Sequence, residues 1–420
     1  MRACFVLPSL RPSGGVAVAV AHARGLVRDH GVETELLVLE LGGEQPAEVD
    51  GVPVRALAEI GERRYDVAIA TWWQTAAALW EIDAARRTIL LQSFEQRFYD
   101  PHASFERLAA ESTLALPLSF LAVAPWMRDV LAKIRPGAQC RVVPVGIDKQ
   151  VFTAEREVRR VGPLRVLIEG QPTLPFKGVR EAVAAVEAMS EPVHSTLVAL
   201  EPGSVGELAL DRVVGGLDAA GMAALYQESD VLVKLSRVEG LGLAPVEGFH
   251  SGLPCVLAPY TGHEEYAEHG VNAIVAGFDD VPGMAGWLDR LARDRRLLAR
   301  LSEGAIETAQ RWPSSARSTE LLLEALVQLA AGAAPEADVS LLHRTLALHG
   351  ELGREQLGRT GALEDALADA QAHVRELSES REECSRMLNS SREELAAIKA
   401  TRSYRAARRA QRALKAVRRR

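Results

Sequence analysis

Cysteine is scarce in this sequence, and the few cysteines are far apart. The 420 residues include four of them, Cys4, Cys140, Cys255 and Cys384, and no two have the spacing of a pair. This distribution argues against a disulfide scaffold, a zinc ribbon and a CxxC redox site, and it is typical of a reducing cytosol. We therefore expect a cytoplasmic protein.

Long apolar runs are lacking as well. No uninterrupted apolar stretch reaches the roughly 20 residues that a membrane-spanning helix needs. The first apolar run breaks at Pro8, which is too early for the apolar core of a signal peptide. Hydrophobic residues nevertheless make up 48% of the chain, so most of it can bury a core and is not expected to be disordered.

Basic residues are outnumbered over most of the chain and concentrated at its end. Residues 401–420 hold nine Lys and Arg and no acid, whereas the first 400 residues carry 40 basic and 56 acidic residues. An acidic body does not suit nucleic-acid binding, so no nucleic-acid partner is expected. The basic tail predicts a helix that lies on an anionic membrane surface, with a solvated tail as the alternative.

Short apolar runs alternate with helical patterns over the first 331 residues. This alternation predicts mainly parallel sheets with helices on both faces. The polar segment 146–162 interrupts it, so we expect two Rossmann-like domains, 1–155 and 156–331. The expected strands are 2–7, 34–39, 66–70, 88–91, 121–124, 141–145, 164–168, 196–200, 231–235, 255–258 and 273–275, and the expected helices include 16–27, 75–85 and a helical stretch at 281–331.

A third region, 338–400, contains an apolar seam with steps of four and three residues. This spacing and the charged flanks predict a coiled coil and therefore a homo-oligomer, while a single helix packed on the body is the alternative. The seam consists of Leu363, Leu367, Ala370, Val374, Leu377, Cys384, Leu388, Leu395 and Ile398.

Two loops that follow strands are candidates for binding an anion. Gly14 and Gly15 follow Ser13 at the expected start of a helix, where backbone amides can approach a negative charge. Lys177 precedes Gly178 in a loop after the first strand of the second domain, and its ammonium could bind a phosphate. The alternatives are a plain strand–helix turn and an exposed loop lysine.

A glycine-rich turn between two carboxylates is the strongest motif. Glu239 begins the run Glu239–Leu243, which contains two glycines, and Glu247 follows on the next helix. A carboxylate at Glu247 can accept two adjacent hydroxyls, as a ribose presents, and Glu239 can bind a second polyol. Complementing the helix dipole is the alternative role for Glu247, but it does not explain the pair.

The E-x7-E spacing of Glu239 and Glu247, followed by Ser251-Gly252-Leu253-Pro254 and the loop Thr261-Gly262, resembles the signature of family 4 retaining glycosyltransferases. The resemblance implies an α/β protein of the GT-B fold, with two Rossmann-like domains facing a cleft. It also implies a hexosyltransferase that uses a nucleotide-sugar donor.

The resemblance also implies roles for individual residues. Glu239 and Lys177 would be catalytic, Glu239 by binding the transferred sugar and Lys177 by balancing the diphosphate charge. Glu247 would bind the ribose. Gln171 stands where the family usually has an arginine, so one positive charge on the diphosphate is missing. The implied donor-binding residues are Gly14, Gly15, Gln171, Lys177, Glu239, Gly240, Leu243, Glu247, Thr261 and Gly262.

A further segment, 91–101, resembles a loop of rhamnosyltransferases that build bacterial surface polysaccharides. It reads Leu-Gln-Ser-Phe-Glu-Gln-Arg-Phe-Tyr-Asp-Pro. By this resemblance Gln92 and Glu95 contact a glycan or lipid-linked acceptor, and the donor is dTDP-rhamnose or a UDP- or GDP-sugar. A packed aromatic turn at the domain surface is the alternative.

No DxD-like metal pair stands at a strand end, and the resemblance implies transfer without a metal or other cofactor. It implies same-face attack by the acceptor hydroxyl, with the donor phosphate receiving the proton. The alternative function is a catalytically inactive GT-B scaffold that assembles partners through its coiled coil, for which Gln171 is the only support. In either case the protein is expected in the cytoplasm, peripheral on the inner face of the membrane if the basic tail binds there.

Overall fold

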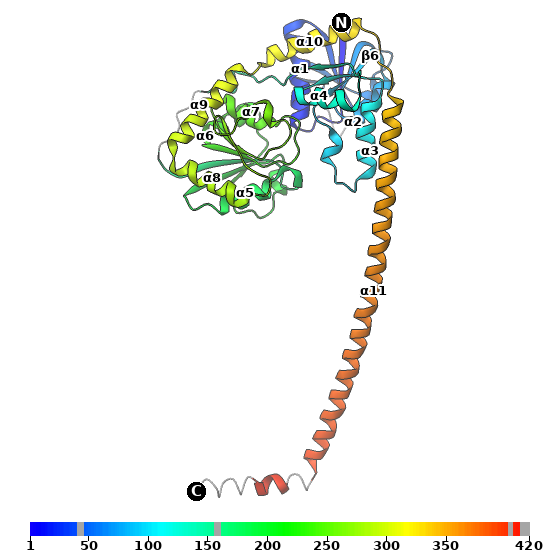
Figure 1. Ribbon diagram of the computed structural model, residues 1–420, viewed down its shortest axis with the longest axis vertical. Coiled ribbons are helices and arrows are strands. Elements are labelled where there is room, and N and C mark those ends of the chain that lie inside the picture. Colours follow the sequence, from blue (N-terminus) through cyan, green and yellow to red (C-terminus); the bar gives the residue numbers. More distant parts are fainter. Residues whose placement is uncertain (40–45, 155–160, 402–405, 412–420) are drawn as a thin grey trace. The chain divides into compact units, whose positions relative to one another are not determined.

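The computed structural model describes residues 1–39, 46–154, 161–401 and 406–411, with only some of the side chains between 356 and 398. The chain forms two compact units, Met1–Ala347 and Leu348–Arg420. The first unit contains two sheets, each in a lobe of its own (Figure 1). The two α/β sheets of the expected fold are therefore present.

The N-terminal lobe is built on a sheet that, in the described residues, has eight strands in the order β3-β4-β2-β1-β5-β6-β7-β8. All its strand pairs are parallel except β3 with β4. Ala3–Leu7 of the central strand β1 are fully buried, as expected for a parallel strand covered on both faces. The strands are β1 (Arg2–Leu7), β2 (Glu33–Val38), β3 (Glu48–Val49), β4 (Val52–Ala56), β5 (Arg64–Ala70), β6 (Asp83–Leu91), β7 (Ser119–Ala122) and β8 (Cys140–Val142).

Helix α1 follows β1 through a short turn and begins at the carboxyl edge of the sheet. The Ser13 hydroxyl caps it by accepting from the Val16 amide at 3.2 Å, and Gly31 ends it in the left-handed region. Its amino terminus therefore points its free amides toward that edge. The helices of this part are α1 (Gly14–His30), η1 (Leu57–Glu59), α2 (Trp73–Ala78), η2 (Leu79–Glu81), η3 (Glu95–Phe98), α3 (Ser104–Ser112), η4 (Thr113–Ala115) and α4 (Pro125–Ile134).

The C-terminal lobe has a parallel sheet with, among the described residues, six strands in the order β11-β10-β9-β12-β13-β14. Its strands are β9 (Leu164–Glu169), β10 (Val193–Val198), β11 (Arg212–Val214), β12 (Val231–Lys234), β13 (Cys255–Leu257) and β14 (Ala273–Val275). Its helices are η5 (Pro175–Lys177), α5 (Val179–Glu187), η6 (Pro202–Ser204), α6 (Ala219–Glu228), α7 (Leu243–His250), η7 (His263–Glu265), α8 (Val281–Arg293) and α9 (Arg295–Arg311).

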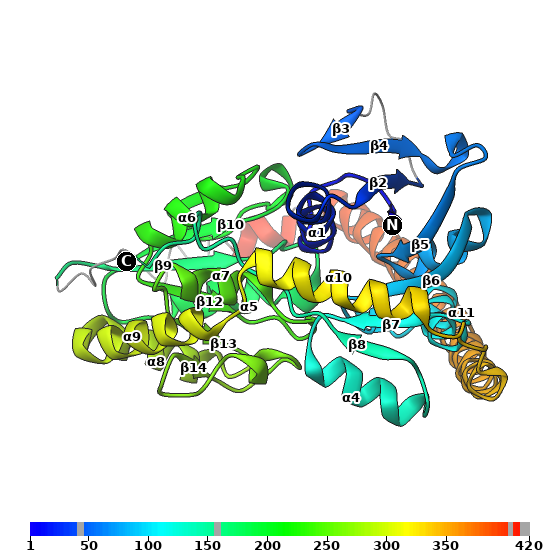
Figure 2. The ribbon, with the colours of Figure 1, turned by 90° about the horizontal axis from the view of Figure 1, so that it is seen from above.

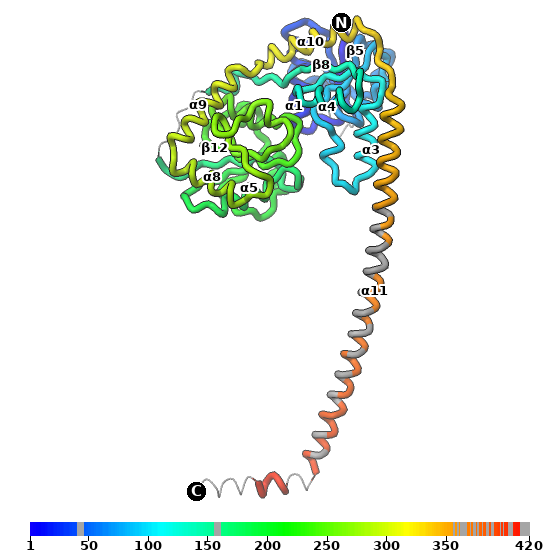
Figure 3. The backbone as a smooth tube through the Cα atoms, viewed as in Figure 1, coloured from blue at the N-terminus to red at the C-terminus, as the bar shows by residue number. Residues whose placement is uncertain are grey.

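Helix α10 (Ser315–Ala331) crosses back from the C-terminal lobe to the N-terminal lobe (Figures 2 and 3). Its apolar face buries Leu322 and Leu326 in the core of the N-terminal lobe. The Arg86 side chain holds its end by donating to the carbonyls of Leu329 and Gly332. The sequence-based boundary at 331 assigned this helix to the second domain, but its packing joins it to the first.

Helix α11 (Val339–Ala400) realises the helical pattern expected over 338–400. Its start is anchored in the N-terminal lobe, where Leu341 is buried and Arg135 donates to the carbonyl of Glu336. The apolar seam from Leu363 to Ile398 lies outside the described side chains, so the coiled coil stays a prediction. In the tail, residues 406–411 are helical, and 402–405 and 412–420 lie outside the described residues.

Some elements differ from the sequence-based expectation. The short strands β3, β4 and β11 were not expected. Strands β3 and β11 have only two and three residues, and β4 contains Pro53, so each gives a weak strand signal. The helix expected over 75–85 ends at Glu81, since Asp83 already pairs with Arg64 of β5. Pairing with a buried neighbour strand outweighs the helix propensity of the run Asp83–Arg87.

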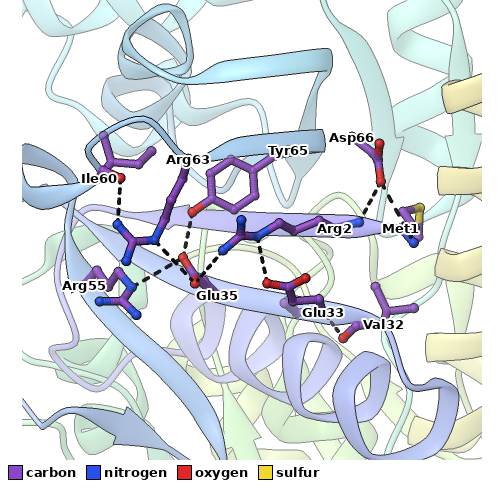
Figure 4. Close-up of polar contacts among 11 residues, drawn as sticks. Met1, Arg2, Val32, Glu33, Glu35, Arg55, Ile60, Arg63, Tyr65 and Asp66 are labelled. Carbon is purple, nitrogen blue, oxygen red and sulfur yellow. Dashed lines mark hydrogen bonds and ion pairs between the residues drawn. The ribbon is translucent and has the colours of Figure 1, made fainter.

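A buried carboxylate ties the amino-terminal ends of the central strands together (Figure 4). Glu35 of β2 is 5% exposed and accepts from the Tyr65 hydroxyl at 2.7 Å and from Arg2 at 3.2 Å. The guanidinium groups of Arg55 and Arg63 lie within 4 Å of the same carboxylate. Burial raises the pKa of Glu35, but Tyr65, Arg55 and Arg2 outweigh burial and hold the pKa below its ordinary value.

Candidate active site

A cavity of about 280 Å³ lies between the lobes, beside the carboxyl ends of their strands. In open parallel sheets this edge is where ligands bind. Its walls are loops that follow strands of both sheets, so it is built from segments far apart in the sequence. Its lining includes Pro8, Ser13, Gly14, Gly15, Thr71, Trp72, Gln92, Ser93, Glu95, Phe98, Val123 and Val145 from the N-terminal lobe, and Lys177 and Glu239–Leu243 from the C-terminal lobe.

The amino terminus of α1 forms one wall. Gly14 and Gly15 line the cavity, and nothing lies within 4 Å of the place where a Cβ on Gly14 would stand. The Gln92 side chain, from the loop after β6, donates to the carbonyl of Gly15 at 3.2 Å. A backbone with open space and free amides at a helix start can hold an anion.

The opposite wall holds a lysine paired with a carboxylate. The Lys177 ammonium lies 2.9 Å from Oε1 of Glu239. A second lysine, Lys234 at the end of β12, lies 2.9 Å from the same oxygen and also contacts Glu169. Burial raises the pKa of Glu239, but Lys234 and Lys177 outweigh burial and lower that pKa to about 2. Glu239 is therefore a carboxylate at neutral pH and can accept hydrogen bonds from hydroxyls.

The glycines of the turn after Glu239 are required by close approaches. A Cβ on Gly240 would lie 1.8 Å from the Gln92 carbonyl oxygen of the other lobe. Gly242 has a φ of 82° and precedes α7, and a Cβ there would lie 2.6 Å from the Tyr260 hydroxyl. The turn thus brings the first amides of α7, beginning at Leu243, to the cavity.

Glu247 lies one turn further along α7 and is not part of the cavity lining. Its Oε2 accepts from the Tyr226 hydroxyl of α6 at 2.9 Å. Burial raises the pKa of Glu247 to about 7; the Tyr226 hydrogen bond opposes this rise and the Glu169 carboxylate adds to it. Glu247 therefore lies on the helix that follows the turn, outside the cavity that Glu239 lines.

Glu95 lines the cavity from the N-terminal lobe and is 5% exposed. Its Oε2 accepts from the Trp73 amide at 2.6 Å, whereas its Oε1 has no hydrogen-bond partner among the described residues. Burial raises the pKa of Glu95 to about 8, against the lowering by the Trp73 amide. Ser93 beside it also lines the cavity, and its hydroxyl is likewise buried without a partner in the described part of the chain.

Besides Glu247, three of the residues expected to bind the donor are outside the cavity lining. The Gln171 amide bonds to the Ser204 hydroxyl and accepts from the Glu201 amide, so it serves the loop after β10. Thr261 and Gly262 lie at the contact between the lobes instead. Gln171 therefore brings no positive charge to the cavity, and its side chain is bonded elsewhere.

Side chains of the N-terminal lobe bridge to the C-terminal lobe beside the cavity. The Trp126 indole donates to the carbonyl of Gly240 at 2.9 Å. Arg97 donates to the Thr261 hydroxyl at 3.3 Å, and its guanidinium lies over the Trp126 ring. These contacts fix the distance between the two walls. A further bridging pair is Phe98 with Phe176, whose ring centroids are 5.4 Å apart.

Sequence reasoning missed Lys234 and Trp126. Lys234 ends an otherwise apolar strand five residues before Glu239, and a lysine in such a run is a signal for a buried ion pair. Trp126 carries no such signal, because its role depends on the lobe that faces it. No group of His, Cys, Asp and Glu side chains in the described part of the chain is arranged to hold a metal ion, and transfer without a metal remains a prediction.

Comparison with known proteins relates one segment of the chain to a known family. Residues 212–308 match the family model of glycosyl transferases group 1. A curated relative, the amylovoran biosynthesis glycosyltransferase AmsK of Erwinia amylovora, is 24% identical over 209 residues, which are 45% of this chain and 50% of that protein. The chain thus matches about half the length of this relative.

Solved structures share the fold over most of the chain. Sucrose-phosphate synthase from Thermosynechococcus elongatus superposes with a TM-score of 0.68 and 15% identity over 79% of this chain and all of that one. Anabaena HepE in complex with UDP and glucose has a TM-score of 0.63 and 18% identity over 78% of this chain and all of that one. The expected GT-B-like fold is confirmed. The solved structures share the fold, and the family model covers residues 212–308 of it.

Proposed function

We propose that the chain is a retaining hexosyltransferase that moves a sugar from a nucleotide-sugar to a glycan or lipid-linked glycan. The observation that carries this proposal is the cavity between the lobes. One wall offers the first backbone amides of α1 at Gly14 and Gly15, and the other offers Lys177, Glu239 and the start of α7. Helix amino termini and a lysine suit a diphosphate, and an ionised carboxylate suits sugar hydroxyls.

In this proposal the donor diphosphate lies between the two helix starts. Lys177 stabilises the charge of the leaving diphosphate, and Glu239 holds hydroxyls of the transferred sugar. Glu247, with Gln171, Thr261 and Gly262, completes the donor side only if the lobes rearrange on binding, because none of these four lines the cavity in this structure. The structural relative HepE was solved with UDP and glucose, which supports a nucleotide-sugar donor here.

The acceptor enters from the N-terminal lobe, where Gln92 and Glu95 line the cavity. Retention follows from attack on the same face from which the diphosphate leaves. The acceptor hydroxyl forms the new bond to the sugar carbon, the bond to the diphosphate oxygen breaks, and the hydroxyl proton passes to that oxygen. No protein nucleophile and no bound metal or other cofactor takes part in this scheme.

The segment 91–101 favours a rhamnosyl donor such as dTDP-rhamnose, with UDP- and GDP-sugars as the other candidates. The Erwinia relative is named for amylovoran biosynthesis, which favours a biosynthetic role here, and we propose that the product is a bacterial surface polysaccharide.

A screen of dTDP-rhamnose, UDP-glucose and GDP-mannose tests the proposal. We expect one of them to raise the Tm of the protein and to be consumed when a glycan acceptor is added, with product analysis giving an unchanged anomeric configuration. Lys177→Met should weaken donor use by about 1.5–3 kcal/mol, the strength of one hydrogen bond to a charged group. Lys133→Met, an exposed lysine on α4, is the matched control and should behave as wild type.

A catalytically inactive scaffold is the second candidate, and one observation favours it. Gln171 is turned to the Ser204 loop and supplies no positive charge to the cavity. If the same screen gave neither thermal stabilisation nor donor consumption, an inactive scaffold would be the better-supported function.

We further propose that α11 forms a homo-oligomeric coiled coil and that the basic tail binds the anionic inner face of the membrane. None of the described helices is both long and apolar enough to pass through a bilayer. Each Lys or Arg near an anionic surface contributes about 1 kcal/mol. Replacing the nine basic residues of 401–420 by glutamine should abolish sedimentation with anionic vesicles at low salt, and unchanged sedimentation would contradict the proposal.

A further inference from the structure

Lys234 is a buried lysine held between two carboxylates. It ends β12, and the pairing of Val233 with Ile168 places it beside Glu169 at the end of β9. Its side chain is 2% exposed, and its ammonium contacts both Glu169 and Glu239. A buried ammonium requires such partners, because removing its charge from water is costly.

The two lysines that share Glu239 are not equivalent. Both ammonium groups lie 2.9 Å from Oε1 of Glu239. The Lys177 side chain is 22% exposed and lines the cavity, whereas Lys234 lies behind Glu239 and outside the lining. A ligand in the cavity can therefore compete for Lys177 but not for Lys234.

This asymmetry matters when a diphosphate takes Lys177. Glu239 would then lose one cation while staying buried, and a buried carboxylate without a counter-ion is strongly unfavourable. With Lys234 in place, Glu239 keeps a partner throughout. Without Lys234, Glu239 would hold Lys177 and withhold it from the ligand.

We propose that Lys234 is a positioning residue that acts as the permanent counter-ion of Glu239, and so frees Lys177 to bind the diphosphate of the donor. This proposal rests on the proposed function for its ligand, but the counter-ion role itself can be tested in the ligand-free protein. It also explains how the site works without a cation at Gln171: the charge comes from Lys177, released by a second lysine.

Other titratable groups near Glu239 do not replace Lys234. Burial raises the pKa of the Tyr260 and Tyr266 hydroxyls well above its ordinary value, so both stay neutral. Arg97 of the N-terminal lobe interacts electrostatically with Glu239, but its guanidinium donates its hydrogen bond to the Thr261 hydroxyl. The two lysines are thus the cations that directly pair with Glu239 among the described residues.

The first test is a carbon-13 NMR titration of the glutamate carboxyls in the ligand-free protein, with the Glu239 signal assigned by its loss in Glu239→Gln. In the wild type we expect Glu239 to stay ionised down to about pH 3, given a pKa of about 2. In Lys234→Met the titration should move to higher pH, and Lys234→Arg should restore it. An unchanged titration in a folded Lys234→Met protein would refute the proposal.

The second test is calorimetric binding of UDP, GDP, dTDP and inorganic pyrophosphate. Lys234→Met should bind the best of these about tenfold more weakly at neutral pH, the effect of losing one charge-assisted contact. The loss should shrink as the pH falls, because protonation of Glu239 releases Lys177. Combining Lys234→Met with Glu239→Gln should restore the affinity, since no carboxylate then holds Lys177.

Glu169→Gln is the matched control, because it removes a contact of Lys234 but leaves the counter-ion of Glu239 in place. It should bind the same probe nearly as well as wild type. A loss in this control equal to that in Lys234→Met, or no restoration in the double variant, would show a merely structural role. If the wild type bound none of the four probes, the proposed function would fail, while the titration would still decide on Lys234.

Discussion

Glu239→Gln removes the charge that two lysines share and keeps the shape of the side chain. The pKa of Glu239 lies at about 2 in the folded protein against an ordinary value of 4.5. Linkage converts this difference into about 3 kcal/mol of folding free energy at neutral pH. Because the side chain is only 11% exposed, solvent screens little of that contribution. We expect the variant to be less stable by about this amount at pH 7.

The difference in unfolding free energy between wild type and Glu239→Gln should depend on pH in a defined direction. A carboxyl with a lowered pKa stabilises the folded state fully above its unfolded pKa, here 4.5, and loses that contribution as the pH falls toward 2. Urea unfolding of wild type and variant should show a constant difference from pH 7 to 5 and a shrinking one below 4.5. A difference under about 1 kcal/mol at pH 7, or one that grows with acid, would refute the reasoning.

Three further predictions concern other parts of the first unit. Gly14→Ala should leave thermal stability equal or slightly higher, since its Cβ meets open space at a helix start, yet reduce donor affinity measured by calorimetry; unchanged affinity would remove α1 from the site. Gly240→Ala should lower both the Tm and kcat, because its Cβ would overlap the Gln92 carbonyl of the other lobe; a wild-type kcat would show that this contact is dispensable. Glu35→Gln should lower the free energy of unfolding, measured in urea at pH 7, by roughly 1–3 kcal/mol, because hydrogen bonds to a charged group are lost. The difference from wild type should shrink in acid, because the pKa of Glu35 is lowered on folding. Equal stabilities at pH 7 would contradict this prediction.

The strand–helix alternation was readable because buried parallel strands are short apolar runs and the helices between them are amphipathic. β1 and β14 begin and end where the sequence predicts. The pattern fails where an element depends on a neighbour, as for the start of β6 at Asp83. It also fails for α10, whose apolar stripe does not reveal which of the two cores it covers.

The candidate site shows the same division. Gly14, Gly15, Lys177, Glu239, Gly240, Leu243, Gln92 and Glu95 line one cavity, as a shared site requires. Gln171, Thr261 and Gly262 were proposed from motif position, but in the structure these residues make contacts outside the cavity. Motif position identifies the loop, whereas the direction of each side chain depends on what packs beside it.

The sequence alone determined most of the longer strands, the glycine turns and the spacing of the two glutamates, because local spacing and residue type govern backbone geometry and the chemistry that a side chain can offer. The tertiary structure alone decided that Lys234 and Lys177 meet at one oxygen of Glu239, and that Trp126 and Arg97 reach across to the other lobe. Contacts between residues tens to hundreds of positions apart depend on how sheets and lobes pack, and that packing minimises the free energy of the whole molecule rather than of any one segment.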